Sequence, residues 1–298
     1  MASYYELGAS LPELSVDDTK VGLSCAEFVH EFLLQATPRD RELIELVLLN
    51  SDNKIVLAIL QGKALPELYL PSVSSAEKIR EYIALQEEDE LDSNPKAQIP
   101  SYLQRFIRKY LAGDYKENSF FTEDILHSYY LEYASSRANE FLLKWFQLCQ
   151  YISSILAAKT AKKYGLDSSQ HLIGDTELMH ILRSSSWSEL NHFEEADTLQ
   201  KIVQISEEKN LVLREKKLDS LKWDFLNEYT FADPFSINAM LSYLLKLQII
   251  ERWVVLDRDR GIERFHQLLS NLKKQGKEQL QTFLEETSKQ KHSPTVQS

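Results

Sequence analysis

The sequence predicts an all-α protein, and three observations lead to that prediction. Leucine occurs 46 times in the 298 residues, whereas valine occurs 11 times and glycine only 8 times. Leucine, glutamate and lysine favour helices, while strands and tight turns are richer in valine, threonine and glycine. Apolar residues also recur at helical spacing between recognisable capping signals. We therefore expect packed helices along most of the chain.

In the first half of the chain, capping signals define three helix starts. Thr37-Pro38 combines an N-cap residue with proline at the first helical position. Ser74 and Glu77 have the spacing of a capping box. Pro100-Ser101 opens a helix that we expect to end at Gly113.

The second half is expected to hold three long helices and one further capping box. The box is formed by Ser186 and Glu189. The helices are expected over 122–164, before Gly165, over 200–227, and over 235–256, after Asp233-Pro234.

Two stretches have the composition of linkers. Residues 86–99 are acidic and precede Pro100, which predicts a solvated loop. From Thr287 onward the chain is polar and has no periodicity, so we expect a disordered tail.

The spacing of the glycines and the net charge exclude several functions. The nearest two glycines, Gly165 and Gly174, are nine residues apart, so no glycine-rich phosphate loop or GxSxG elbow exists. We therefore expect no nucleotide and no other cofactor. The net charge of −11 argues against binding nucleic acid or anionic lipid and fits a basic protein partner.

Hydropathy and cysteine content predict a soluble cytoplasmic protein. The N-terminus lacks the basic start and apolar run of a signal peptide. The longest uncharged apolar stretch, 145–158, has 14 residues and is too short to span a bilayer. Cys25 and Cys149 form no CxxC pair and no zinc spacing, so we expect reduced thiols in apolar surroundings.

A glutamate lies three residues before a histidine in the pairs Glu27/His30, Glu177/His180 and Glu263/His266. Two E-x-x-H motifs on facing helices, with two further glutamates, would build a di-iron site. The alternative is that these pairs lie on exposed helix faces. The motifs are far apart in sequence, which favours the exposed pairs over a helical metalloenzyme.

Other candidate groups have simpler structural interpretations. His192, Glu194, Glu195 and Asp197 are expected at a solvated helix start, and Asp17-Asp18 in a loop. The aromatic residues between 129 and 146 recur at helical spacing, and the residues between them are mostly polar or acidic, which favours a helix–helix core over a stacking platform. We identify no catalytic residue.

Weak internal similarity suggests a repeat of about a hundred residues. Ile59-Leu60, which ends an apolar helix, is echoed by Ile155-Leu156 and by Val255-Leu256. These echoes predict three related helical units, 1–95, 96–170 and 171–275, followed by a polar tail over 276–298. Residues near 40–63, 136–159 and 236–259 are then expected to superpose.

Three segments together resemble a known family. They are Tyr4 to Leu14, Leu48 to Lys63, and the pair Arg214 to Trp223 and Leu244 to Trp253. They are similar to divergent bacterial relatives of the C subunits of V/A-type ATPases, which are called d subunits in eukaryotic enzymes. The resemblance covers most of residues 4–272.

The resemblance implies a funnel-like protein of three related helical domains without a catalytic site. Members of that family cap the membrane rotor ring on its cytoplasmic side, receive the rotor shaft, and transmit torque. The expected localisation is thus cytoplasmic and peripheral to a membrane. In that family each repeat carries an Asn-Ile/Leu-Arg/Lys core. This sequence has a partial match at Asn53-Lys54. The second and third copies differ from the core, with Tyr151-Ile152-Ser153 and Arg252-Trp253-Val254. No interface residue is carried over, and a generic helical scaffold remains the alternative.

Overall fold

The structure is a computed structural model that describes residues 4–68, 70–87, 99–115, 122–165, 172, 176–184, 187–231 and 233–257. Every regular element within these ranges is a helix, which confirms the all-α prediction. Most of the acidic linker, Ser186, the polar tail and the Glu263/His266 pair lie outside the described residues.

The described residues of the first half of the chain form six helices, and the other helices lie in the second half. The first six are α1 (Tyr5–Ser10), α2 (Cys25–Gln35), α3 (Pro38–Leu60), α4 (Ala76–Glu87), α5 (Ser101–Ala112) and α6 (Thr122–Ser135). They are followed by α7 (Glu140–Tyr164), α9 (Glu177–Ser184), the 3₁₀-helix η2 (Trp187–His192), α10 (Ala196–Ser206), α11 (Leu211–Thr230) and α12 (Ile237–Asp257).

Several predicted helix ends are confirmed. The Thr37 hydroxyl accepts a hydrogen bond from the Asp40 amide at 3.2 Å, with Pro38 at the first helical position of α3. Gly113 and Gly165 close α5 and α7 with φ of 85° and 65°, a left-handed conformation in which a Cβ would be strained.

Two of the expected long helices are wrong, because each is interrupted by a capping asparagine. Residues 122–164 form α6 and α7, and the Asn139 side chain caps α7 by accepting from the Leu142 amide at 3.0 Å. Residues 200–227 likewise divide between α10 and α11, where Asn210 accepts from the Val212 amide at 3.0 Å. An asparagine satisfies the free amides of a helix start, so it favours a new start over continuation.

Two predicted starts are displaced by one or two residues. Ser75, and not Ser74, caps α4 by accepting from the Lys78 amide at 3.3 Å, while Ser74 is buried. The last helix begins at Ile237, two residues later than expected, because the Ser236 hydroxyl accepts from the Ala239 amide.

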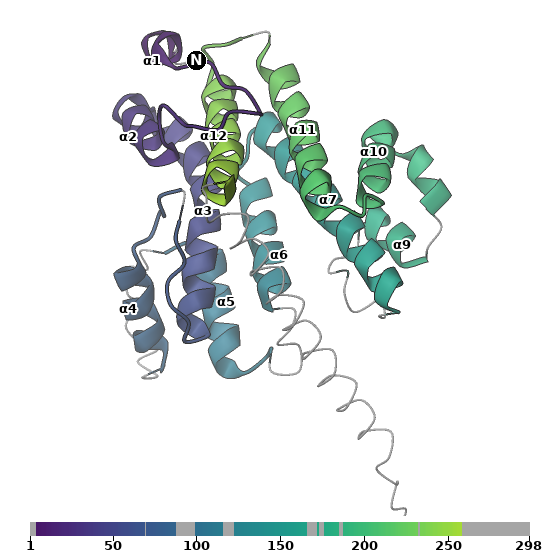
Figure 1. Ribbon diagram of the computed structural model, residues 1–298. Helices are drawn as coiled ribbons and strands as arrows, with labels where there is room; N and C mark the ends of the chain where they lie inside the picture. The colour runs from purple at the N-terminus through teal and green to yellow at the C-terminus, as the bar shows by residue number, and fades with distance from the viewer. Residues whose placement is uncertain are drawn as a thin grey trace, which may run out of the picture.

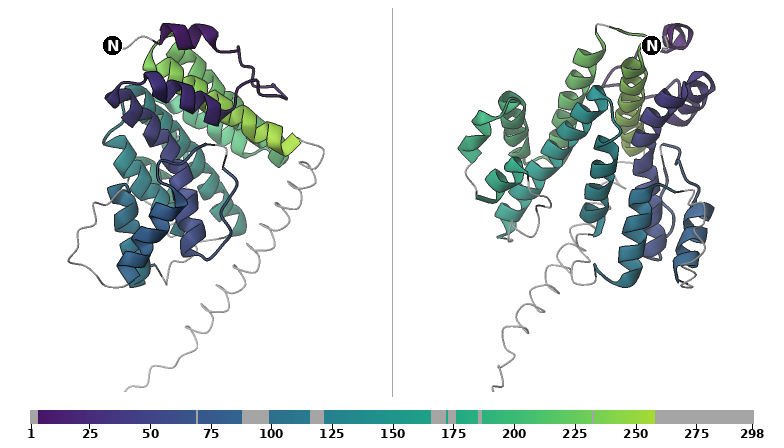
Figure 2. Two further views of the ribbon diagram at one scale, coloured as in Figure 1. Left: turned by 90° about the vertical axis from the view of Figure 1, so that its left-hand side faces the viewer. Right: turned by 180° about the vertical axis from the view of Figure 1, so that it is seen from behind.

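The buried apolar residues form two clusters, which define two lobes. The large lobe contains α1 to α6, the first two turns of α7, the end of α11, and α12. The small lobe contains the rest of α7, α9, η2, α10 and the start of α11. In Figure 1 and in the view from behind in Figure 2, α9 and α10 lie on one side of α7, while α3, α4 and α5 lie on the other.

The lobes do not follow the predicted units 1–95, 96–170 and 171–275, since α7 and α11 each contribute to both clusters. The relation between the three units remains a prediction. The predicted aromatic core is confirmed at Tyr130, Phe141 and Phe146, which are buried in the large lobe. In the described part of the chain, no helix is both long and apolar enough to cross a membrane.

Candidate functional site

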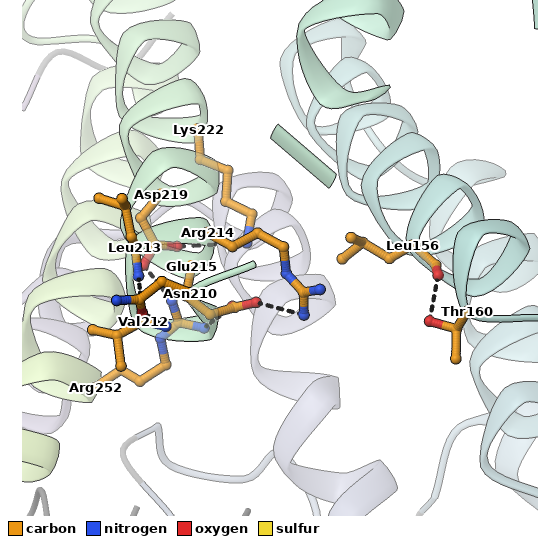
Figure 3. Close-up of polar contacts among 10 residues, drawn as sticks. All are labelled: Leu156, Thr160, Asn210, Val212, Leu213, Arg214, Glu215, Asp219, Lys222 and Arg252. Atoms are coloured by element: carbon orange, nitrogen blue, oxygen red, sulfur yellow. Dashed lines mark hydrogen bonds and ion pairs between the residues drawn. The ribbon is translucent and has the colours of Figure 1, made fainter. Parts of the chain in front are cut away.

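The most concentrated set of charges in the structure lies where α11 packs against α12. It combines Arg214, Glu215, Asp219 and Lys222 of α11 with Arg252 and Trp253 of α12, and we call it the α11–α12 charge network. Both of its helices belong to the third segment of the family resemblance. Figure 3 shows these charged side chains converging between the two helices.

Asp219 is the centre of the network. Its side chain is only 1% exposed, and its Oδ2 accepts hydrogen bonds from the Arg252 guanidinium and from the Trp253 indole nitrogen, the latter at 2.7 Å. The Lys222 ammonium lies 3.7 Å from Asp219 Oδ1. A carboxylate held between two cations and an indole donor is stabilised as an anion and fixed in orientation.

The network continues outward through alternating charges. Arg252 also lies 3.8 Å from Glu215, and Glu215 lies 3.9 Å from Arg214. In Figure 3 the Arg214 side chain extends from α11 toward the Leu156 and Thr160 turn of α7. Arg214 is one-quarter exposed, so the network reaches from the buried Asp219 to the surface between α11 and α7.

This arrangement fits a clamp between helices better than a reaction centre. Asp219 Oδ2 already has two donors, and Oδ1 is buried beside the Lys222 ammonium without a hydrogen-bond donor, so neither oxygen is accessible to a substrate. The adjoining cavity has a volume of about 80 Å³, lined by residues that include Asp17, Asp18 and Lys216. Such a volume holds little more than a few waters. The network therefore fixes α12 on α11.

A second buried polar group lies in the middle of α3. Four consecutive side chains, Asn50 to Asn53, contact three other segments of the chain: the loop over 70–74, α5 and α6. Two of these side chains bind the loop: Ser51 donates to the Leu70 carbonyl at 3.0 Å, and Asp52 accepts from the Val73 and Ser74 amides at 2.8 Å each. The other two bind tyrosine hydroxyls. Asn53 accepts from the Tyr102 hydroxyl at 2.7 Å, and Asn50 donates to the Tyr130 hydroxyl at 3.4 Å. Burial raises the pKa of the Asp52 carboxyl, and the hydrogen bonds from Ser74 and Val73 oppose that rise.

The first segment of the resemblance is also held by polar contacts to distant helices. The Tyr4 hydroxyl donates to Asp40 at 2.5 Å, and the Tyr4 amide donates to the Phe235 carbonyl at 2.9 Å. The Cys25 amide donates to Glu251 of α12 at 2.8 Å. Each of the three recognisable segments thus contributes side chains that join remote helices.

A cleft of about 370 Å³ separates the two lobes. Its walls come from α6, from the second half of α7, and from Leu172 and Met179 of the small lobe. The lining is rich in hydroxyls and contains His127, whose pKa is lowered by burial. The cleft is large enough for a small molecule, and its lining combines hydrogen-bonding side chains with apolar surface from residues such as Leu131 and Met179.

The E-x-x-H residues are not brought together. Glu27 and His30 are exposed on α2 in the large lobe, and Glu177 and His180 are exposed on α9 in the small lobe. Glu27 forms a capping box with Ser24, accepting from its amide at 2.8 Å and from its hydroxyl at 2.7 Å. Among the described residues, no group of three or more histidine, cysteine or acidic side chains is arranged to hold a metal ion.

The other candidate residues lie where a purely structural role predicts them, at a solvated helix start, in a loop and in apolar surroundings. His192, Glu194 and Asp197 are exposed around the turn between η2 and α10. Asp18 accepts from the Ser15 amide at 2.8 Å in a loop turn. Both cysteines are free thiols, and burial raises the pKa of each. A raised thiol pKa disfavours the nucleophilic thiolate.

Sequence reasoning missed the α11–α12 charge network, although a signal for it was present. Glu251 and Arg252 are adjacent charges within the otherwise apolar second half of α12, and Asp219 follows the buried Leu218. A charge within an apolar helix face usually has a buried partner. The two partners were not identifiable, because they lie 33 residues apart on different helices.

Comparison with known proteins places the chain in one family. It belongs to the family described as "Protein of unknown function (DUF2764)", whose match covers residues 1–276. No curated protein and no solved structure matches the chain significantly. The family therefore covers both lobes and carries no stated activity.

Proposed function

We propose that the protein is a non-catalytic central-stalk subunit of a V/A-type rotary ATPase, which couples the rotor shaft to the membrane ion-carrying ring. The observation that carries the proposal is the placement of the three resembling segments. Each of them lies in a junction where polar side chains join different helices or a helix and a loop. A protein that transmits torque requires such fixed junctions.

The chemistry of the described residues supports a coupling role over an enzymatic one. Asp219 and Asp52, two buried carboxyl groups, are both engaged by donors from neighbouring segments. Buried charges of this kind fix the relative orientation of helices, and removing one partner leaves the other unpaired. In this proposal the chain contributes stiffness and contact surfaces, and ATP hydrolysis and ion transport belong to other subunits.

Association with the rotor can be tested by affinity purification at native abundance. A tag placed after residue 298 would be used to isolate the protein from membranes solubilised in a mild detergent. We expect shaft and ring subunits to be recovered together with the protein. Recovery of neither, while the ATPase head remains detectable in the same extract, would contradict the proposal.

A matched pair of variants adds a control for structural integrity. Asp219→Ala breaks the α11–α12 charge network, whereas Asp224→Ala removes an exposed acid further along the same helix. We expect Asp219→Ala to reduce recovery of the rotor subunits and Asp224→Ala to leave it unchanged. Equal recovery with both variants would show that the clamp is not needed for assembly.

A further inference from the structure

One end of the molecule is built from α1 and the turn between α11 and α12. The Tyr4 amide donates to the Phe235 carbonyl at 2.9 Å, and the rings of Tyr5 and Phe235 are 4.7 Å apart. A Cβ on Gly8 would lie 2.8 Å from the Phe235 ring, so only glycine permits this close approach. Figures 1 and 2 show the N-terminal helix beside this turn.

Aromatic side chains project from this end. Phe231 is 92% exposed and Tyr5 is 63% exposed, and Phe235 lies half-buried beneath Tyr5. We call these three residues the aromatic tip. A phenylalanine that is almost fully in water gains nothing from the folded core, so its favourable burial requires another molecule.

A groove of about 330 Å³ continues from the tip. Leu11, Pro12 and Leu14 form one wall, and Pro234 and Met240 contribute to the other. Lys246 also lines the groove, with its ammonium 5.4 Å from the centre of the Trp223 ring. Burial lowers the pKa of Lys246. The lining also includes the polar residues Glu13, Asn227 and Tyr243, and Thr230 of the lining directly precedes the exposed Phe231, so the groove can accept both apolar and polar side chains next to that ring.

The segments that form this end carry more acidic than basic residues. Residues 4–14 and 226–245 contain no lysine or arginine and four acidic residues, namely Glu6, Glu13, Glu228 and Asp233. Lys246, at the edge of the second segment, is the basic residue that lines the groove. Glu6, Glu228 and Asp233 are exposed close in sequence to the aromatic tip.

Basic side chains on the neighbouring helix starts do not neutralise this surface. Arg39 is paired with Glu42 at 3.0 Å, and Lys144 is paired with Glu140 at 3.4 Å. Arg41 donates to a backbone carbonyl of α2. Exposed acids thus lie on the same segments as the exposed aromatic rings.

We propose that the aromatic tip and its groove are a docking surface for a basic amphipathic helix of a protein partner. The apolar face of such a helix would cover Phe231 and enter the groove, and its lysines or arginines would meet the acids. An anionic lipid surface would be repelled by the same acids. The assignment rests on this surface alone and holds whether or not the partner belongs to a rotary ATPase.

The proposal is tested with the full-length chain and a defined peptide. The peptide is an 18-residue helix with leucine on one face and lysine on the other, carrying a fluorescent label, and its counterpart has glutamate in place of lysine. Phe231→Ser removes the exposed ring without altering the charge, and Leu34→Ser is the control at a residue that is 69% exposed on α2. Both positions are exposed, so both variants are expected to fold.

We expect the lysine peptide to bind the native protein and Phe231→Ser to weaken binding about tenfold or more, as for a buried aromatic anchor. Leu34→Ser should bind like the native protein, and the glutamate peptide should not bind. Equal binding by the two variants, or no binding of the lysine peptide, would overturn the proposal. Stronger Phe231-dependent binding to phosphatidylglycerol vesicles than to the peptide would overturn it in favour of a lipid surface.

A photo-reactive benzoylphenylalanine at position 231 identifies the natural partner in cells, with the same group at position 34 as control. A cross-link from position 231 to a basic, apolar-faced segment supports the docking surface. If that segment belongs to a protein outside the rotary ATPase, the docking surface stands while the proposed function fails. A cross-link to an acidic segment, or the same products from both positions, contradicts the docking surface.

Discussion

The two lobes differ in the interactions that stabilise each of them internally. In the large lobe, side chains that are remote in sequence meet through hydrogen bonds, such as Tyr102 with Asn53 and Glu251 with the Cys25 amide. The small lobe packs around apolar residues, and its helices are joined at the surface by ion pairs such as Lys159 with Glu207, at 2.9 Å. An exposed pair of this kind contributes little, on the order of 0–1 kcal/mol.

Because of this difference, the helices of the large lobe have a fixed arrangement, whereas those of the small lobe can shift relative to one another. Buried hydrogen bonds require particular partners at particular distances, whereas apolar contacts tolerate small shifts. The large lobe therefore provides the fixed frame. The small lobe is attached to it through α7 and α11, with the interlobe cleft between them.

The largest effect is expected where the lobes meet on α11. Asp219→Ala should lower the free energy of unfolding by about 3–5 kcal/mol, because Arg252 and Lys222 lose the buried partner that balances them. Urea unfolding would measure the loss. The double variant Asp219→Leu/Arg252→Met should lose less than Asp219→Ala, and a larger loss would contradict the clamp.

Two leucine-to-alanine variants, each creating a cavity in one lobe, test whether the two lobes unfold independently. Leu199 in the small lobe and Leu142 in the large lobe are both fully buried. We expect each leucine-to-alanine change to cost about 2–5 kcal/mol. Hydrogen exchange should accelerate in α9, η2 and α10 for Leu199→Ala, and across α2, α3 and α12 for Leu142→Ala. Identical exchange patterns would show that the two lobes open as one unit.

A smaller effect on stability is expected at the start of α2. The variants used there also test whether Glu27 serves as a helix cap or as a metal ligand. Ser24→Ala should cost about 1 kcal/mol through loss of the cap. Glu27→Gln should retain the capping box, because glutamine serves at that position as well as glutamate. Thermal unfolding would measure the stability of each variant, and metal analysis would measure its bound metal. Bound metal that disappears in Glu27→Gln and His30→Ala would revive the E-x-x-H hypothesis.

The smallest effect is a pH dependence in the cleft. Burial holds the pKa of His127 below its usual value of 6.5, so neutral His127 favours the folded state. This contribution is complete above pH 6.5 and is lost as the pH falls through the lowered pKa. Urea midpoints at pH 7.5 and 5.5 should differ more for the native protein than for His127→Gln. The opposite order would exclude a buried neutral histidine.

The fold class and most helix positions could be predicted from the sequence, because they depend on local signals. Thr37-Pro38, Gly113 and Gly165 each act within one turn of the helix that they begin or end. The division of 122–164 was missed because Asn139 is a weak signal within a continuous apolar pattern. Its side chain also donates to Asn238, at 2.8 Å, which only the tertiary structure reveals.

The candidate site could be predicted only in part. The segments that carry the resemblance were identified, and the structure places their polar residues at helix junctions. The pairing of Asp219 with Arg252 and Trp253 was not predictable, because contact between helices depends on the packing of the whole chain. The exposed Phe231 was missed for the same reason, since sequence alone does not reveal burial.

The contacts of α1 and α2 with α12 have a consequence for the order of folding during synthesis. Tyr4 and Cys25 bond to Phe235 and Glu251, which leave the ribosome more than two hundred residues later. Until then α1 and α2 lack the helix that covers them, and the buried face of α2 stays open to water. The first residues made are therefore among the last to reach their native contacts, and the apolar face of α2 is exposed to intermolecular association in that interval.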